Sequence, residues 1–231
     1  YGALQGNCGS DNTAVGAAAL EVSTSSENTA VGAGAGFSLT DVSGGVFIGQ
    51  HAGLFATTAS NSTFVGHSAG QGITGAKLTG NSNTAVGTNA GKVLQGAATE
   101  NTFVGFGAGD AFTNANYNVA IGAVALGADT LGSRSVAVGQ GALSTQNFTS
   151  ATDVENVAIG YDAGVAITTG FKNTIVGGLG YDNLRNGDRN ISIGYDTSAS
   201  GIDDSLAILI GVSITSGGAG TARLGNSGGT A

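Results

Sequence analysis

The nine residues NTAVGAGAG at positions 28–36 decide the fold of this 231-residue chain, because close copies recur along nearly its whole length. Two clear copies are NVAIGAVAL at 118–126 and NVAIGYDAG at 156–164. Twelve anchor glycines, each after a β-branched residue, follow one another at spacings of 16 to 21 residues. Such a period is the signature of a solenoid, in which each repeat forms one coil. The anchors, which we expect to mark one corner of each coil, are Gly16, Gly32, Gly49, Gly66, Gly87, Gly105, Gly122, Gly139, Gly160, Gly177, Gly194 and Gly211.

The residues before each anchor have the alternation of a β-strand. In the first full copy, Val15 precedes the anchor and Thr13 lies two residues earlier, so both share one strand face, whereas Ala14 lies on the other. Both faces are apolar in most copies, and both must therefore be covered. We expect the β-branched face to fill the coil and the intervening row to face partner chains. That expected subunit-interface row is Ala14, Ala30, Phe47, Phe64, Ala85, Phe103, Ala120, Ala137, Ala158 and Ile175.

A second apolar segment follows many anchors by seven residues, as at Leu39, Leu94 and Ile167, and predicts a second short strand in each coil. Asn stands four residues before the anchor in eight of the twelve copies, where it suits the turn that opens the strand. The pattern therefore predicts an all-β fold, a parallel β-solenoid or β-roll of about 12 coils of ~17 residues.

The repeat covers residues 1–231 as a single repeat domain. We expect a partial first repeat at 1–10, full repeats at about 11–215 and a degenerate terminal repeat at 216–231. Two copies are longer than the rest, and their extra residues fall at 71–82 and 144–155. Insertions in a solenoid emerge as lateral loops, where binding specificity is often placed. Neutral length variation at an outer turn is the alternative.

Composition narrows the classes of partner. The chain has 43 glycines, no proline and a net charge of −8 from 7 basic and 15 acidic residues. We therefore do not expect this acidic chain to bind nucleic acid or anionic membrane surfaces. Cys8 is the single cysteine, so the chain has no disulfide framework or thiolate metal cluster of its own. Because no apolar run approaches 18 residues, we expect no membrane insertion in this segment, and we expect no signal peptide at Tyr1.

Residues that could carry chemistry are few. His51 and His67 lie in adjacent copies, but no Asp or Glu recurs beside them at metal-ligand spacing, so we expect exposed turn residues. We expect no enzyme, no catalytic residue, no cofactor and no metal. A glycan-degrading spike would need a pair of converged carboxylates. An ice-binding solenoid would need a regular threonine array, and the row through Thr40 and Thr57 is broken at Gln95.

Three Tyr-Asp pairs are candidates for contact with a cell-surface glycan or protein receptor. An exposed tyrosine ring can stack on a sugar face while the neighbouring carboxylate accepts hydrogen bonds from sugar hydroxyls. Packing within a turn is the alternative. The candidate contact residues are Tyr161, Asp162, Tyr181, Asp182, Tyr195 and Asp196.

Stacking of the coils also predicts a charge ladder. Arg134, Glu155 and Lys172 stand one residue before the Asn position in consecutive copies. In register they would lie ~5 Å apart with alternating sign. A structure that placed them on different faces would contradict the repeat alignment.

The quoted copies resemble the head repeat of trimeric autotransporter adhesins, and NTFVGFGAG at 101–109 also resembles repeats in the long tail fibres of bacteriophages. The resemblance implies a left-handed parallel β-roll of three intertwined chains, that is, a homotrimer. It also implies an extracellular location, on a virion tail fibre or a cell surface, and binding to host matrix or cell surfaces. The copies here are longer than the adhesin repeat, and neck motif, coiled-coil stalk and membrane anchor are missing from these residues, which favours a phage or other extracellular fibre.

These observations predict a non-enzymatic structural and recognition fibre segment that spaces and presents a host or cell-surface binding region. The alternative is a self-assembling extracellular filament whose subunits stack end to end, since open solenoid ends expose strand edges. A glycan-degrading spike and an ice-binding solenoid are the weaker alternatives.

Overall fold

The computed structural model describes residues 2–5 and 8–226. This part of the chain is all-β and contains no helix, as the repeat predicts. It forms a parallel β-solenoid of about 13 turns. The chain divides into two compact units, Tyr1–Asn118 and Val119–Ala231, both built from the same coil.

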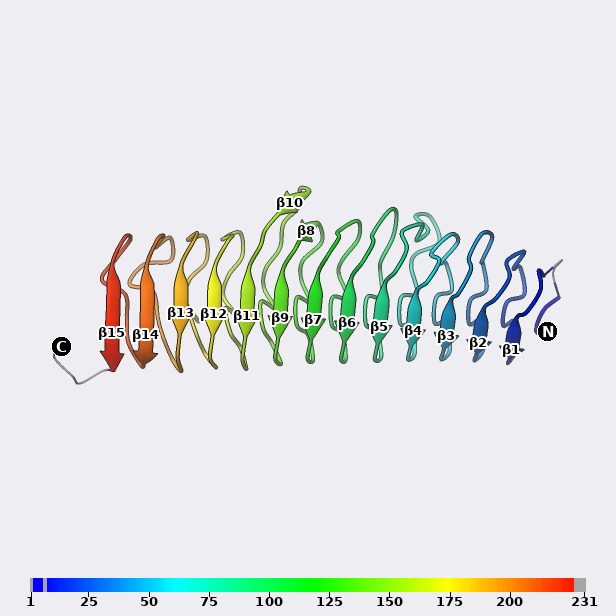
Figure 1. Cartoon of the computed structure of the whole chain (residues 1–231), viewed down its shortest axis with the longest axis horizontal. Coiled ribbons are helices and arrows are strands. Elements are labelled where there is room, and N and C mark those ends of the chain that lie inside the picture. Colours follow the sequence, from blue (N-terminus) through cyan, green and yellow to red (C-terminus); the bar gives the residue numbers. More distant parts are fainter. Residues whose placement is uncertain (1, 6–7, 227–231) are drawn as a thin grey trace. The chain divides into compact units, whose positions relative to one another are not determined.

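The first unit holds one parallel strand per coil (Figure 1). Equivalent repeat positions are paired, so that Thr13 lies beside Thr29 and Thr84 beside Thr102, which confirms the alignment on the anchor glycines. The strands are β1 (Thr13–Val15), β2 (Thr29–Val31), β3 (Val46–Ile48), β4 (Thr63–Val65), β5 (Thr84–Val86) and β6 (Thr102–Val104).

The second unit repeats this ladder, with Val157 beside Thr174 and Ile191 beside Ile208. The weak copy at the end of the repeat forms the strand β15, which raises the number of coils above the twelve expected. The remaining two-residue strands β8 and β10 form a separate small parallel sheet. The strands of this unit are β7 (Val119–Ile121), β8 (Gly132–Ser133), β9 (Val136–Val138), β10 (Thr152–Asp153), β11 (Val157–Ile159), β12 (Thr174–Val176), β13 (Ile191–Ile193), β14 (Ile208–Val212) and β15 (Ala222–Asn226).

The two strand faces are reversed relative to the sequence-based expectation. The intervening row, expected to face partner chains, points into the coil of its own chain, where every member except the half-buried Ala14 is fully buried. The assignment of Ala30, Phe47, Phe64, Ala85, Phe103, Ala120, Ala137, Ala158 and Ile175 to a subunit interface is therefore wrong. The β-branched rows beside it face outward instead.

Complementary volumes across the narrow coil explain this reversal. Phe103 fills the interior opposite Gly109, where an added Cβ would lie 2.7 Å from the ring carbon Cδ1. In another coil the sizes are exchanged, since Ala120 is followed six residues later by the buried Leu126. Alternating large and small residues across facing positions fills the interior without voids. The inner row is thus selected by volume and the outer rows by β-propensity.

The second strand expected in each coil is absent from most described coils. Residues in left-handed conformation recur at fixed positions, as in one coil at Glu155 (φ 57°), Asp162 (φ 50°) and Gly164 (φ 62°). Each such residue bends the chain too sharply for an extended strand to continue. The second apolar segment is still buried at Leu39, Leu94 and Ile167, but these residues come directly after turns and lie outside any strand.

The anchor glycines do form a corner, as expected. Gly122 has φ 132°, a conformation that is essentially restricted to glycine. An added Cβ there would lie 2.5 Å from the carbonyl carbon and oxygen of Gly139 in the next coil. Conformation and coil-to-coil contact therefore both require glycine at this corner.

Asparagines before the strands form a second ladder inside the coils. The side-chain oxygen of Asn83 accepts a hydrogen bond from the backbone N–H of Asn101 at 3.1 Å, and that of Asn101 accepts one from Asn118 at 3.0 Å. All three side chains are fully buried. The role expected for these residues, in the turn that opens the strand, thus extends to joining one coil to the next.

Candidate functional site

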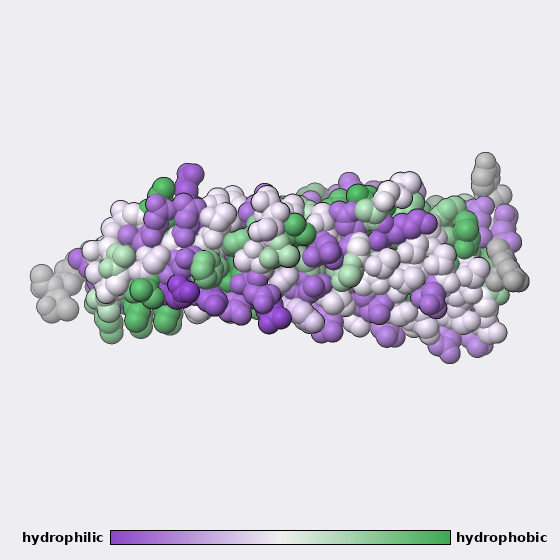
Figure 2. Space-filling model, turned by 90° about the horizontal axis from the view of Figure 1, so that it is seen from above, coloured by the Kyte–Doolittle hydropathy of each residue, from purple (hydrophilic) through white to green (hydrophobic). Residues whose placement is uncertain are grey.

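The most extensive surface feature is the outward face of each strand ladder. In the second unit, Ile191, Ile193, Ile208 and Ile210 expose 38–42% of their area although they lie in paired strands. Val176 and Ile159 continue the same rows on β12 and β11. Hydrophobic side chains gather along one edge near the C-terminal end in Figure 2. In the first unit, the corresponding rows are mainly Thr and Val.

The Tyr-Asp pairs have different environments. Tyr161 and Tyr195 each expose 55% of their area, so both are free to meet a ligand. Tyr181 is fully buried, so its assignment as a candidate contact residue is wrong. It stands four residues after its anchor, at the inward position that Leu126 and Leu143 occupy in other coils. Burial, with a smaller effect from the charge of Asp204, raises the pKa of the Tyr181 hydroxyl, which has no hydrogen-bond partner among the described residues.

The two exposed tyrosines share one column of the coil stack. The backbone N–H of Leu179 donates to the carbonyl of Tyr161 at 2.8 Å, and that of Asp196 donates to the carbonyl of Gly178 at 3.0 Å. Tyr161, Gly178 and Tyr195 therefore occupy equivalent positions in three successive coils. The ring of Tyr195 leans toward the intervening glycine, with its Cδ2 3.6 Å from an added Cβ at Gly178.

The carboxylates of these pairs are held by polar neighbours. A hydrogen bond from Tyr161 to Asp162, together with the charge of that carboxylate, raises the pKa of the Tyr161 hydroxyl. Asp196 accepts a hydrogen bond from the Ser213 hydroxyl at 2.9 Å. The exposed Asp182, beside the buried Tyr181, faces Ser198 at 3.4 Å.

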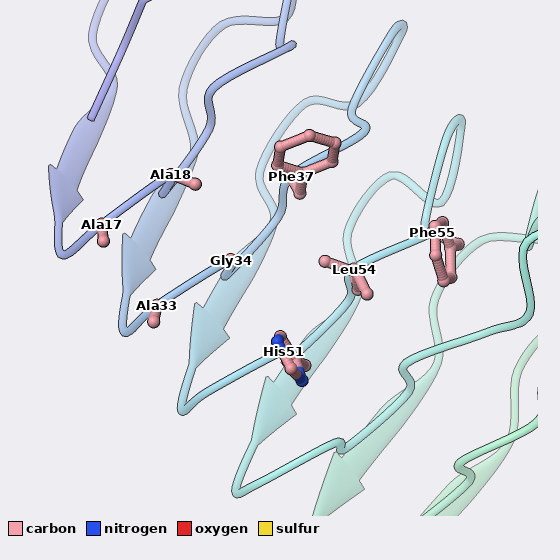
Figure 3. Close-up of a pocket in the computed structure, with 8 residues that line it drawn as sticks. All are labelled: Ala17, Ala18, Ala33, Gly34, Phe37, His51, Leu54 and Phe55. Atoms are coloured by element: carbon pink, nitrogen blue, oxygen red, sulfur yellow. The ribbon is translucent and has the colours of Figure 1, made fainter. Parts of the chain in front are cut away.

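The two histidines lie close together, as their positions in adjacent copies suggest. The rings of His51 and His67 have centroids 6.3 Å apart. Among the described residues, no group of three or more His, Cys, Asp or Glu side chains could hold a metal ion. His51 instead borders an open apolar hollow of about 380 Å³ (Figure 3). Its lining is Ala17, Ala18, Ala33, Gly34, Phe37, His51, Leu54 and Phe55.

The hollow is shaped by residue size rather than by converging polar groups. Figure 3 shows Ala17 and Ala33 just after two neighbouring strands, with Phe37 farther along the coil of Ala33 and Phe55 in the next coil, that of His51. The small residues leave space that the aromatic rings border. His51 is the one titratable side chain that lines this hollow. The hollow is suited to an apolar group and offers no acid–base pair.

Both longer loops combine exposed and buried residues. In 71–82, Ile73 is exposed, whereas Leu78 is fully buried and bridges to Ala56 and Gly96. In 144–155, β10 pairs with β8 and stands clear of the main ladder (Figure 1).

The second loop also returns a side chain to the interior. Gln146 donates to the carboxylate of Asp129 at 2.5 Å and to the hydroxyl of Ser135 at 3.2 Å, and it accepts from Asn156 at 2.8 Å. Ser135 stands where most copies have the ladder asparagine, so Gln146 occupies the space left by that shorter side chain. Burial raises the pKa of Asp129, although hydrogen bonds from Gln146, Phe148 and Gly132 oppose the shift.

The charge ladder is confirmed in its register. Lys172 and Glu155 approach to 3.7 Å, as stacking of adjacent coils predicts. Arg134 lies in the equivalent left-handed position (φ 65°) and pairs with Asp153 of the longer loop at 3.1 Å. These exposed pairs contribute at most ~1 kcal/mol each and report the alignment more than stability.

Sequence reasoning missed the outward apolar face and the gap between the two exposed tyrosines. The described part of the chain offers no apolar helix of membrane-spanning length. Comparison with protein-family models, curated proteins and solved structures finds no match to this chain.

Proposed function

We propose that this chain is a segment of a non-enzymatic extracellular fibre in which three copies associate through the outward faces of their strand ladders. The observation that carries the proposal is the pair of outward β-branched rows, which residues 2–5 and 8–226 leave partly exposed. Contiguous exposed apolar surface on a soluble protein commonly marks an interaction site. The face differs from the one expected from sequence, but it serves the same purpose.

The energetics favour a long interface over a local patch. Six side chains of β11 to β14, each about 40% exposed, would contribute about 4–7 kcal/mol on burial, at roughly 1.5–3 kcal/mol for a whole side chain. Association itself costs about 4–15 kcal/mol. The six residues alone are therefore marginal, and many coils must take part. An interface that follows the ladder is the geometry expected of a fibre.

The homotrimer and the extracellular location are supported by the resemblance of the repeat to adhesin heads and phage tail fibres. In a closed symmetric assembly each copy presents the same outward rows to its neighbours, so the same residues form every contact between copies. The outer turns stay accessible for recognition of a cell-surface glycan or protein.

Sedimentation equilibrium tests the assembly. We expect the wild-type chain to sediment at three times its 22.2 kDa mass. Ile193→Lys combined with Ile210→Lys places charges on the outward face and should yield monomers with unchanged circular dichroism. Ile202→Lys is the matched control, because Ile202 is 49% exposed in a turn. A monomeric wild type would contradict the proposal, and long filaments in negative-stain images would support end-to-end stacking instead.

A second candidate function rests on the outward rows of the first unit. Thr occupies one row in β1, β2, β4, β5 and β6, with Val46 as the exception in β3, and Val or Ile occupies the other row. Parallel strands repeat such an array every ~4.8 Å, which could order water as ice does. Thermal hysteresis measured on a monomeric sample would support ice binding. Its absence, with normal ice-crystal growth, would exclude it.

A further inference from the structure

We propose that Tyr161 and Tyr195 bind a linear, uncharged saccharide that lies along the coils of the second unit and spans the gap at Gly178. The inference deepens the recognition part of the proposed function and does not depend on the number of copies in the assembly. It rests on the column geometry, on a glycine that the fold does not require, and on the polar groups beside the rings.

The backbone holds the two tyrosines at a fixed distance along the coil stack. They occupy equivalent positions two coils apart, which corresponds to about 9.6 Å at ~4.8 Å per coil. The backbone hydrogen bonds from Leu179 to Tyr161 and from Asp196 to Gly178 fix this register. Both tyrosines are more than half exposed, so a ligand can reach them. Aromatic platforms on a rigid scaffold lose little conformational entropy when they bind.

Gly178 is not required by the backbone. Its φ lies outside the left-handed range, and an added Cβ would make only ordinary contacts at 3.6 Å or more, with the Tyr161 carbonyl and the Tyr195 ring. Other coils carry larger residues at the equivalent position, among them Thr88, Gln140 and Val212. The glycine therefore leaves open a gap that the repeat would normally fill. This gap lies between the backbone positions of Tyr161 and Tyr195, and the Tyr195 ring borders it, with Cδ2 3.6 Å from an added Cβ at Gly178.

Polar groups follow the same line. Asp162 and Asp196 stand one residue after the tyrosines, and Gln140 and Ser213 lie one coil beyond on either side. Their carboxylate, amide and hydroxyl groups can accept or donate hydrogen bonds. Apolar ring faces alternating with such groups suit a sugar chain, whose rings present C–H faces and hydroxyl edges. Because the rings are arranged along the coil axis, an extended chain fits better than a compact one.

The charge of the site selects against anionic ligands. Asp162 and Asp196 are both acidic, and the whole chain carries a net charge of −8. Sulfated or uronic polysaccharides and nucleic acids would be repelled. A basic peptide would meet favourable charges, but it would not use the faces of the two tyrosine rings as a sugar does. An uncharged saccharide uses both the rings and the hydrogen-bonding groups.

The test is a glycan array of neutral and acidic glycans, followed by calorimetry with cellohexaose, laminarihexaose and maltohexaose. We expect binding to at least one neutral linear glycan with a Kd below about 1 mM. Tyr161→Ala and Tyr195→Ala should each weaken binding about tenfold. Gly178→Leu should do the same, because it fills the gap without straining the backbone. Phe106→Ala, which removes an exposed ring at the same coil position in the first unit, should leave affinity unchanged.

Failure to bind any neutral glycan would overturn the inference, as would unchanged affinity in the Tyr161→Ala and Gly178→Leu variants. Binding of hexalysine alone would also overturn it and assign the strip to basic peptides. Sedimentation of every variant separates this result from the assembly proposal. The tyrosine and glycine variants should keep the wild-type mass, whereas Ile193→Lys with Ile210→Lys should change the mass and retain the saccharide site.

Discussion

The side-chain oxygen of Asn173 accepts a hydrogen bond from the backbone N–H of Asn190, one coil further along the chain, at 3.0 Å. The amide of Asn173 also donates to the carbonyl of Gly187 at 2.9 Å. Asn173 and Asn190 are both fully buried, so the bonds cannot be replaced by bulk water. The ladder thus satisfies backbone groups that the turns leave without partners.

Asn173→Ala should lower the free energy of unfolding by about 2–4 kcal/mol, because it leaves a buried N–H and a buried carbonyl without partners. Urea unfolding followed by circular dichroism measures the change. Asn147→Ala is the control, since Asn147 is exposed and accepts a bond from Thr130 at 3.1 Å. That variant should change stability by less than about 1 kcal/mol. Equal losses of unfolding free energy in the two variants would show that a buried asparagine of the ladder stabilises the fold no more than an exposed asparagine does.

Gly122→Ala should lower the free energy of unfolding by about 3–5 kcal/mol, because it combines a conformation reserved for glycine with a clash against the next coil. Gly178→Ala should change it by less than about 0.5 kcal/mol, because neither feature is present there. Thermal and urea unfolding of the two variants compare them directly. Similar stabilities would contradict the structural difference between anchor and outer glycines.

Exchange of volumes across the coil can be tested by a double-mutant cycle. Phe103→Ala should cost about 3–5 kcal/mol by leaving a cavity. Gly109→Leu alone should also destabilise, because its side chain would overlap the Phe103 ring. The two substitutions together place Ala and Leu as another coil places Ala120 and Leu126, and Leu126 adopts a left-handed conformation there (φ 50°). The double variant should be more stable than either single one, and simple additivity of the two losses would refute the complementarity.

The buried carboxyl of Asp129 gives stability a particular pH dependence. Burial raises its pKa in the folded state, so its contribution is fully present below the ordinary value of 3.8 and is lost as pH rises through the folded value. The stability of the wild type relative to Asp129→Asn should therefore fall with increasing pH. Urea unfolding of both proteins across acidic to neutral pH measures this difference.

Asp204 provides a control of opposite sign. Burial alone would raise its pKa, but hydrogen bonds from Ser216, Ser200 and Gly201 outweigh burial and lower it. The ionised Asp204 should therefore make the wild type more stable than the Asp204→Asn variant, and this difference should be lost as pH falls through the folded pKa. Parallel pH slopes for the two aspartate variants would contradict the assigned environments.

The coil register could be predicted from sequence because one repeated motif fixes it. Pairing of Val157 with Thr174 follows from the alignment alone. The inner face could not be chosen from β-propensity, because Ala158 and Ile159 are both apolar and only their fit across the coil distinguishes them. A usable signal was present: Phe103 is followed six residues later by Gly109, and Ala120 by Leu126.

Residue type alone also could not show which of the candidate contact tyrosines face outward and which face the interior. Tyr161 and Tyr181 occur in identical Tyr-Asp pairs, but they stand one and four residues after their anchors. The first position faces outward and the second faces the interior. The gap at Gly178 becomes visible only when three coils are stacked, since glycine is common throughout the chain.

Cysteine cross-linking tests the central claim, that outward strand faces join the copies while the Ala/Phe row stays inside each coil. In a Cys8→Ser background, Ile159→Cys places a thiol on the outward face and Ala158→Cys places one inside. We expect a bismaleimide to link Ile159→Cys chains to one another, and Ala158→Cys to react only after unfolding. Cross-linking through Ala158→Cys, with Ile159→Cys left freely reactive and unlinked, would contradict the claim.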